Sequence, residues 1–174
     1  ADAMEDLFSA VDDEIMFGAM SMDDVLELIE WASDIHIARP KKSNLNPGVP
    51  STRQVIEFQD RFLKDKAVFT GYDASEGALY VLFMLTLAMH PDVPGMFAID
   101  SFDHALNPRL AKRITEVFSQ LIIESDKTVF MTTHNPLVLD GLNLADDRIR
   151  LFAINKNKYG HAELNSLQIS REPL

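Results

Sequence analysis

The chain has 174 residues, of which 47% are hydrophobic, so it can form one domain of ordinary size or one lobe of a larger protein. Its formal net charge of −11 argues against a broad nucleic-acid surface, because such a surface would repel phosphate; any contact with DNA is expected to come from another segment or a partner. Without cysteine or an apolar run of about 18 residues, and with acidic first residues unlike a signal peptide, it is predicted to be cytoplasmic, with no disulfide and no membrane partner.

Two amphipathic helices and a loop are predicted for residues 1–50. Residues 2–17 place their apolar side chains on one helical stripe. Ser21 is suited to cap a second helix that runs to about Ser33, and the segment 37–51, rich in Pro, Asn, Ser and Gly, predicts a long loop. We treat 1–50 as a candidate helical insertion and 51–174 as a second unit, and it stays open whether 1–50 is native to the same domain.

From residue 51 onward, strand-like and helical segments alternate. This alternation predicts an α/β fold with a mostly parallel sheet covered by helices. The helix at 76–89 is apolar on all sides, so we expect it to be buried. The apolar run at 95–100 is expected to be a strand buried on both faces. The further strands are predicted at 53–58, 67–70, 128–134 and 148–155, the helices at 108–124 and 136–142, and a returning hairpin strand at 161–170.

Three polar features follow predicted strands, at the edge of a parallel sheet where ligands bind. Ser75 and Gly77 begin the helix at 76–89, where backbone N–H groups and the helix dipole attract phosphate. Asp100 ends the next strand, and Thr-Thr-His at 132–134 ends the one after. Each feature also has a plain structural explanation: Ser75 as a helix cap, Asp100 as a turn residue, and His134 as the start of a helix.

In this order the features resemble the C-terminal lobe of an ABC-type ATPase head. The resemblance is to the RecF/SMC-like soluble branch, which includes the AAA-type ATPases of bacterial phage-defence and DNA-repair systems, and it covers about residues 53–155. "DASEGA" resembles the signature loop, "MFAID" Walker B, "HALNP" the D-loop and "TTHNP" the H-loop. The resemblance implies a P-loop NTPase fold in which ATP and Mg²⁺ lie between two heads. The implied ATP contacts are Ser75, Gly77, Asn107 and His134, and the implied metal residue is Asp100.

The sequence departs from that family at two points. It contains no G-x-x-x-x-G-K-[ST], so the phosphate-binding loop and its lysine are missing, and the chain alone is expected to bind ATP poorly. Ser101 stands where the family has its catalytic glutamate. A serine is no general base at neutral pH, and losing a positioned base typically costs about 10²–10⁴-fold in rate. Asp103, His104 and His134 are the candidates to replace it.

Two functions follow from the resemblance. The first is an ATP-binding head that dimerises with a second head and couples its nucleotide state to an effector, such as a nuclease or DNA. The second is a nucleotide switch or scaffold that does not hydrolyse ATP, which Ser101 favours. A third alternative is an unrelated α/β domain whose acids merely end strands. The sequence does not distinguish hydrolysis from its loss, and it does not identify the effector.

Overall fold

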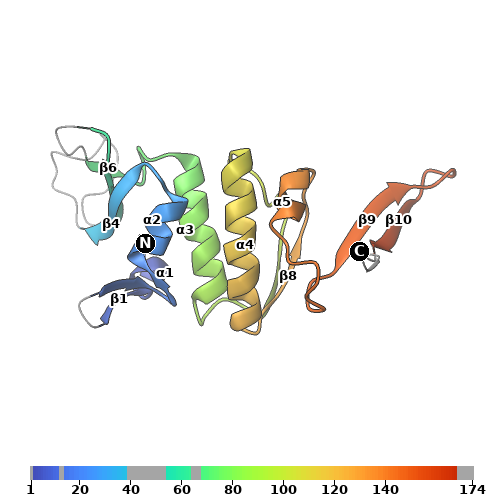
Figure 1. Cartoon of the computed structure of the whole chain (residues 1–174), viewed down its shortest axis with the longest axis horizontal. Coiled ribbons are helices and arrows are strands. Elements are labelled where there is room, and N and C mark those ends of the chain that lie inside the picture. The colour runs from blue at the N-terminus through green and yellow to red at the C-terminus, as the bar shows by residue number, and fades with distance from the viewer. Residues whose placement is uncertain (1, 12–13, 39–53, 64–67, 168–174) are drawn as a thin grey trace, which may run out of the picture.

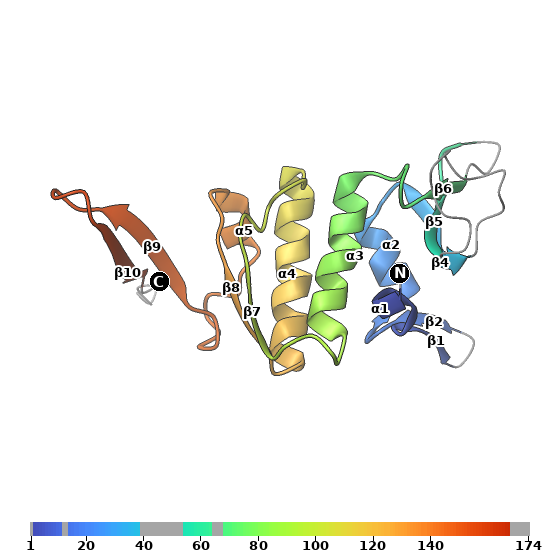
Figure 2. The same cartoon turned by 180° about the vertical axis from the view of Figure 1, so that it is seen from behind.

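Two long helices lie side by side at the centre of the computed structural model, which describes residues 2–11, 14–38, 54–63 and 68–167 (Figure 1). These are α3 (Glu76–Met89) and α4 (Pro108–Glu124), both with the bounds predicted from the sequence. The view from behind shows the same arrangement, with the N-terminal elements beyond α3 and the C-terminal ones beyond α4 (Figure 2). Within the described residues, no helix is both long and apolar enough to span a bilayer.

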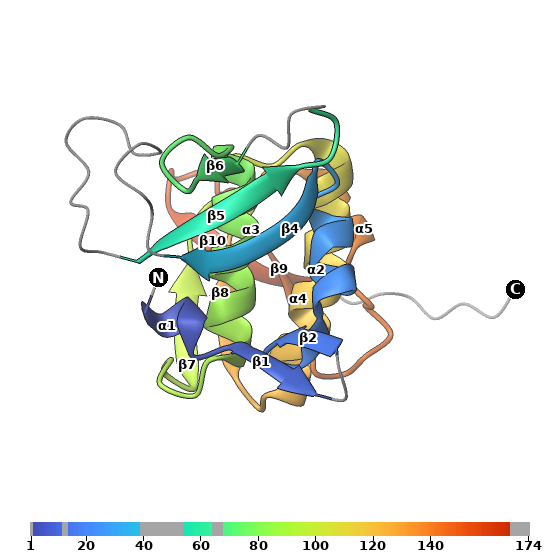
Figure 3. The same cartoon turned by 90° about the vertical axis from the view of Figure 1, so that its left-hand side faces the viewer.

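The N-terminal elements form two small antiparallel sheets, which Figure 3 shows from their own side. In the first sheet β2 lies between β1 and β3, and in the second β5 lies between β4 and β6. Both sheets pair strands that follow one another along the chain, a connection that gives antiparallel pairs. The bounds are α1 Asp2–Glu5, β1 Phe8–Val11, β2 Glu14–Phe17, β3 Met20–Ser21, α2 Met22–Leu28, β4 Ala32–Ala38, β5 Val55–Asp60 and β6 Val68–Thr70.

The predicted helix at 2–17 is wrong. The chain leaves α1 at Glu5 and forms the β1–β2 pair, in which Phe8 lies opposite Phe17. The ring of Phe17 is fully buried and meets the ring of Phe8 edge to face, with centroids 5.1 Å apart.

The predicted cap of the second helix is confirmed, because the Ser21 hydroxyl accepts a hydrogen bond from the Asp24 N–H at 3.1 Å. That helix ends at Leu28, however, and not near residue 33, which lies in β4. Most of the predicted loop at 37–51 lies outside the described residues.

One pair of strands is parallel in the part of the chain that the structure describes: β7 (Met96–Ile99) with β8 (Thr128–Met131), joined by α4. The fold is therefore mixed α/β, and the prediction of a mostly parallel sheet is wrong. A parallel pair needs a crossover connection, and α4 is the crossover that joins these two strands. The predicted C-terminal hairpin is confirmed as β9 (Leu151–Lys156) and β10 (Ala162–Leu167).

The β7–β8 pair is covered on one face only, contrary to the prediction of a strand buried on both faces. Phe97 and Val129 pack against the core, whereas Met96 is 65% and Phe130 60% exposed on the other face. The β9–β10 hairpin is also exposed, including Ile154 at 69%. An apolar strand face left in water is unusual in a folded domain.

The core lies mainly around α3 and α4. Leu82, Met84 and Leu85 of α3 are 0–1% exposed. The expectation that α3 is buried on all sides is only partly met, because Phe83 is 48% exposed. On α4, one face carries the buried side chains Ala111, Ile114, Thr115, Phe118, Leu121 and Ile122.

Gly141, at the end of α5 (Pro136–Asp140), lies against the backbone of α4. A Cβ atom there would come within 2.5 Å of the Lys112 carbonyl oxygen and 2.8 Å of the Thr115 Cβ. We expect Gly141→Ala to lower the free energy of unfolding by about 1–3 kcal/mol, because one of the two helices has to shift. Urea denaturation measures this, with Gly95→Ala as the control, since a Cβ at Gly95 meets no atom within 4 Å. Equal midpoints for wild type and Gly141→Ala would contradict the close approach.

Candidate functional site

The backbone turns sharply directly after β7. Asp100 follows the strand, and Ser101 has φ 53°, a left-handed conformation that is uncommon for a residue other than glycine. The Thr132 hydroxyl, which follows β8, holds this turn from the neighbouring strand. It donates a hydrogen bond to the Asp100 carboxylate and accepts one from the Ser101 N–H at 2.9 Å. The orientation of the predicted site residue Asp100 is thus fixed by a side chain 32 residues further along the chain.

Asp103 is held in the same way by the next threonine. The Thr133 hydroxyl donates to the Asp103 carboxylate at 2.6 Å and accepts from the Asn135 N–H at 3.0 Å. Asp103 is half-buried, while Asp100 is exposed. A carboxylate has about four acceptor positions, so one threonine bond leaves each carboxylate able to bind water, a metal-bound water or a donor. The two carboxylates predicted from the sequence therefore lie at one edge, where the strand ends meet.

The N-terminus of α3 packs against this turn. The Ser75 hydroxyl accepts a hydrogen bond from the Ala78 N–H at 3.2 Å, so Ser75 caps the helix, as its plain structural explanation predicts. A Cβ on Gly77 would lie 2.9 Å from the Ala105 carbonyl oxygen, so this close approach requires glycine. Glu76 Oε1 lies 3.4 Å from His104 Nε2, which adds a polar contact between exposed side chains.

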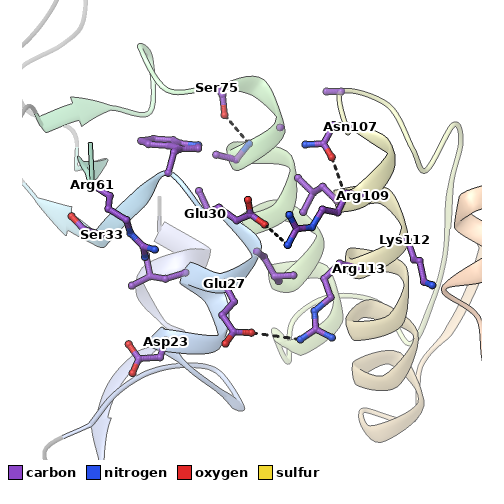
Figure 4. Close-up of a pocket in the computed structure, with 18 of the residues that line it drawn as sticks. Asp23, Glu27, Glu30, Ser33, Arg61, Ser75, Asn107, Arg109, Lys112 and Arg113 are labelled. Atoms are coloured by element: carbon purple, nitrogen blue, oxygen red, sulfur yellow. Dashed lines mark hydrogen bonds and ion pairs between the residues drawn. The ribbon is translucent and has the colours of Figure 1, made fainter. Parts of the chain in front are cut away.

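The N-terminus of α4 lies beside that of α3. Asn107 caps α4 by accepting from the Leu110 N–H at 2.9 Å. Ser75 and Asn107 line one cleft of about 1240 Å³, which continues between α2 and α4 (Figure 4). Arg109 lies 3.2 Å from Glu30 across this cleft, in an exposed ion pair that contributes little stability. Gly77 lines the same cleft, so three of the four predicted ATP contacts lie on one surface.

His134 directly follows Thr133 in the chain. It is exposed after β8, and within the described residues no hydrogen bond or ion pair joins it to Asp100 or Asp103.

Sequence reasoning did not assign roles to three side chains of this site. Thr132 and Thr133 were recognised only as part of the 132–134 motif, although they orient the carboxylates. Their place beside His134 at a strand end was an available signal. Tyr80, whose hydroxyl donates to the Phe102 carbonyl oxygen at 3.1 Å, gave no signal, because it reads as one more apolar residue of a buried helix.

The carboxylate chemistry fits an auxiliary role at a magnesium ion. Asp100 is exposed and keeps acceptor capacity, so it can bind a water of a hydrated Mg²⁺. The described residues contain no group of three or more acidic, histidine or cysteine side chains that could hold a metal by themselves. Magnesium in nucleotide sites is usually held by one or two carboxylates together with substrate phosphates and water. The residues present therefore fit a shared site rather than a closed protein cage.

The fold is similar to that of a solved ATPase structure described as "Structural biochemistry of ATP-driven dimerization and DNA stimulated activation of SMC ATPases". The TM-score is 0.53 at 12% identity, over 82% of this chain and 80% of that chain. At this identity the likeness shows the fold alone.

A family model described as "AAA domain, putative AbiEii toxin, Type IV TA system" matches residues 29–140. Because the match spans more than half of the 174 residues, the chain belongs to this family of AAA domains. A comparison with curated proteins finds no significant match.

Proposed function

We propose that this chain is the C-terminal lobe of an ATPase head that closes on a second head around ATP and Mg²⁺. The observation that carries the proposal is one arrangement at the strand ends. Thr132 and Thr133 orient Asp100 and Asp103, and the turn that bears these carboxylates touches the capped N-terminus of α3. Carboxylates at a strand edge beside a helix N-terminus suit a magnesium–triphosphate complex. The carboxylates can bind the hydrated cation, and the helix N-terminus can bind the phosphate anion.

The missing phosphate loop would come from polypeptide outside this sequence. The chain has no G-x-x-x-x-G-K-[ST], yet it belongs to a family of AAA domains. The exposed apolar face of β7–β8, with Met96 and Phe130, is a surface that such a segment would cover. The proposal also divides the chain into two units, residues 1–50 and residues 51–174.

Each candidate residue has a proposed role. Asp100 would bind a water of the hydrated Mg²⁺, and Ser75 and Gly77 would present the α3 N-terminus to the ATP held by the opposing head. Asn107 would lie in the loop that faces the second head, and His134 would contact the γ-phosphate. Bound Mg²⁺ would neutralise negative charge on the phosphates. The effector would be a nuclease or DNA, and with a net charge of −11 any DNA contact would need other segments.

Hydrolysis depends on which group replaces the glutamate that Ser101 displaces. Asp103 is the better placed candidate base, because its carboxylate is half-buried and fixed by Thr133. His104 and His134 are the other candidates, and both are exposed. The second function, a nucleotide switch or scaffold without turnover, is favoured by Ser101 itself, since this side chain cannot accept a proton from water at neutral pH.

The test is ATP turnover of the full-length protein, measured for wild type, Asp100→Ala and Ser101→Glu. As an ATPase, wild type should hydrolyse ATP and Asp100→Ala should lose about 10²-fold or more, because the hydrated cation loses the carboxylate that orients one of its waters. Asp140→Ala, an exposed carboxylate at the end of α5, is the matched control and should keep wild-type turnover.

The same measurement separates the two functions. Turnover that appears only in Ser101→Glu, while wild type still binds ATP, would support the non-hydrolysing switch. A full-length protein that binds no ATP at all would contradict both.

A further inference from the structure

Tyr80 links α3 to the turn that carries the two carboxylates. It lies one turn into the helix, half-buried, and its phenol hydroxyl donates a hydrogen bond to the Phe102 carbonyl oxygen at 3.1 Å. The two residues are 22 positions apart, so this bond is a tertiary contact. Phe102 lies between Asp100 and Asp103, and fixing its backbone therefore restrains both flanking carboxylates.

Phe102 is anchored from three directions. Its ring is fully buried and lies 5.5 Å, centroid to centroid, from the ring of Phe118 on α4. Its N–H donates to the Thr132 carbonyl oxygen at 2.9 Å, which ties it to the end of β8. The Tyr80 hydroxyl supplies the third anchor, on the carbonyl side. Among these three contacts, the bond from Tyr80 is the one that connects the carboxylate turn to α3.

The turn needs such restraint because its backbone is strained. Ser101 and Ala105 have φ 53° and 61°, a region that residues other than glycine rarely adopt. Strained conformations of this kind persist where surrounding contacts hold them in place, and they gather at functional sites. The Tyr80 bond and the close packing of Gly77 against the Ala105 carbonyl oxygen provide such contacts from α3.

The protonation state of Tyr80 is consistent with its role as a hydrogen-bond donor. Burial, and secondly the negative charge of Asp103, raise the pKa of the Tyr80 phenol. The hydroxyl therefore keeps its proton at neutral pH and remains able to donate to the carbonyl.

We propose that Tyr80 is a positioning residue, whose hydroxyl sets the placement of the 100–107 turn, with Asp100 and Asp103, relative to the N-terminus of α3. The consequence for catalysis rests on the proposed ATPase function. In a two-head sandwich, the α3 N-terminus would face the ATP of the opposing head, while Asp100 would face the ATP of its own. Tyr80 would thus couple the two halves of the site within one subunit.

The first test measures amide hydrogen exchange in the full-length protein for wild type and Tyr80→Phe. The substitution keeps the ring and removes only the hydroxyl. We expect the amides of Phe102, His104 and Leu106, which are hydrogen-bonded within or beside the turn, to exchange about 3- to 10-fold faster. Amides at the centre of α4 should be unchanged. Tyr72→Phe is the matched control, because Tyr72 is 60% exposed and lies before α3.

The second test uses the full-length protein under ATP turnover. Tyr80→Phe should lower kcat about tenfold and leave KM within about twofold, since a displaced carboxylate affects the reacting groups more than substrate binding. Unchanged exchange in the turn would overturn the positioning role. Faster exchange with unchanged kcat would overturn its catalytic consequence. If the wild type shows no turnover, the hydrolytic function fails, while the exchange result still decides whether Tyr80 positions the turn.

Discussion

Replacing Leu82 by aspartate is expected to unfold the domain. Leu82 lies in the middle of α3 and is 1% exposed, within the cluster of buried side chains between α3 and its neighbours. A carboxylate there would be buried away from water, and this costs several kcal/mol unless the charge is paired. We expect a loss of about 4 kcal/mol or more, against a typical total stability of about 5–15 kcal/mol. Thermal and urea unfolding, followed by circular dichroism, measure the loss.

The neighbouring residue offers a matched control for Leu82→Asp. Phe83 lies on the same helix and is 48% exposed, so an aspartate at that position can reach water. Phe83→Asp should therefore lower the free energy of unfolding by no more than about 1 kcal/mol. Both variants place an aspartate inside α3, so their helix propensities are similar. If Leu82→Asp melted cooperatively near the wild-type temperature, the side of α3 assigned to the core would have to be solvent-exposed.

Replacing Ser75 by arginine is expected to abolish ATP-dependent association of the full-length protein. Ser75 is exposed at the N-terminus of α3 and lines the cleft that also contains Asn107. In the proposed sandwich, an arginine side chain would fill the space where the opposing γ-phosphate meets the helix N–H groups. Binding of ATP to the variant's own phosphate loop should be unaffected. Light scattering with and without ATP measures the association.

Ser75→Ala separates this steric effect from the loss of the helix cap. Removing the hydroxyl bond to the Ala78 N–H should cost about 0.5–2 kcal/mol of stability, while association should persist. The three proteins are compared at temperatures equally far below their own melting points. ATP-dependent dimers of Ser75→Arg as abundant as those of wild type would defeat the sandwich assignment and leave Ser75 as a cap alone.

The helices at the centre of the fold could be predicted because their signals are local. Ser75 and Asn107 cap α3 and α4 through bonds to residues three positions further on, and Pro108 is suited to a first helical turn. The short strand β7 is an apolar run of four residues, β8 has three apolar residues after Thr128, and the hairpin of β9 and β10 follows from two strand-like runs around a turn. Such features depend on neighbouring residues only.

The N-terminal region could not be predicted in the same way, because its periodicity is ambiguous. The apolar residues at 2–17 fit a helical stripe, yet β1 and β2 form there because Phe17 finds a fully buried site with Phe8 at its edge. The parallel sheet is also smaller than the sequence predicts. Alternating strands and helices favour parallel pairing, but the strands before α3 pair with their own neighbours and form antiparallel sheets.

The sequence by itself determined the order of the candidate site: a capped helix, a strand followed by Asp100, and a strand followed by Thr-Thr-His. Only the tertiary structure decided which of these groups meet. It brought Thr132 to Asp100 across 32 residues and Tyr80 to Phe102 across 22. The physical reason is that caps and periodicity are set within about one helical turn, whereas these contacts depend on how α3, β7 and β8 pack together. The sequence therefore predicts only that Tyr80 is a core residue, whereas in the fold its hydroxyl donates a hydrogen bond to the turn that carries the carboxylates.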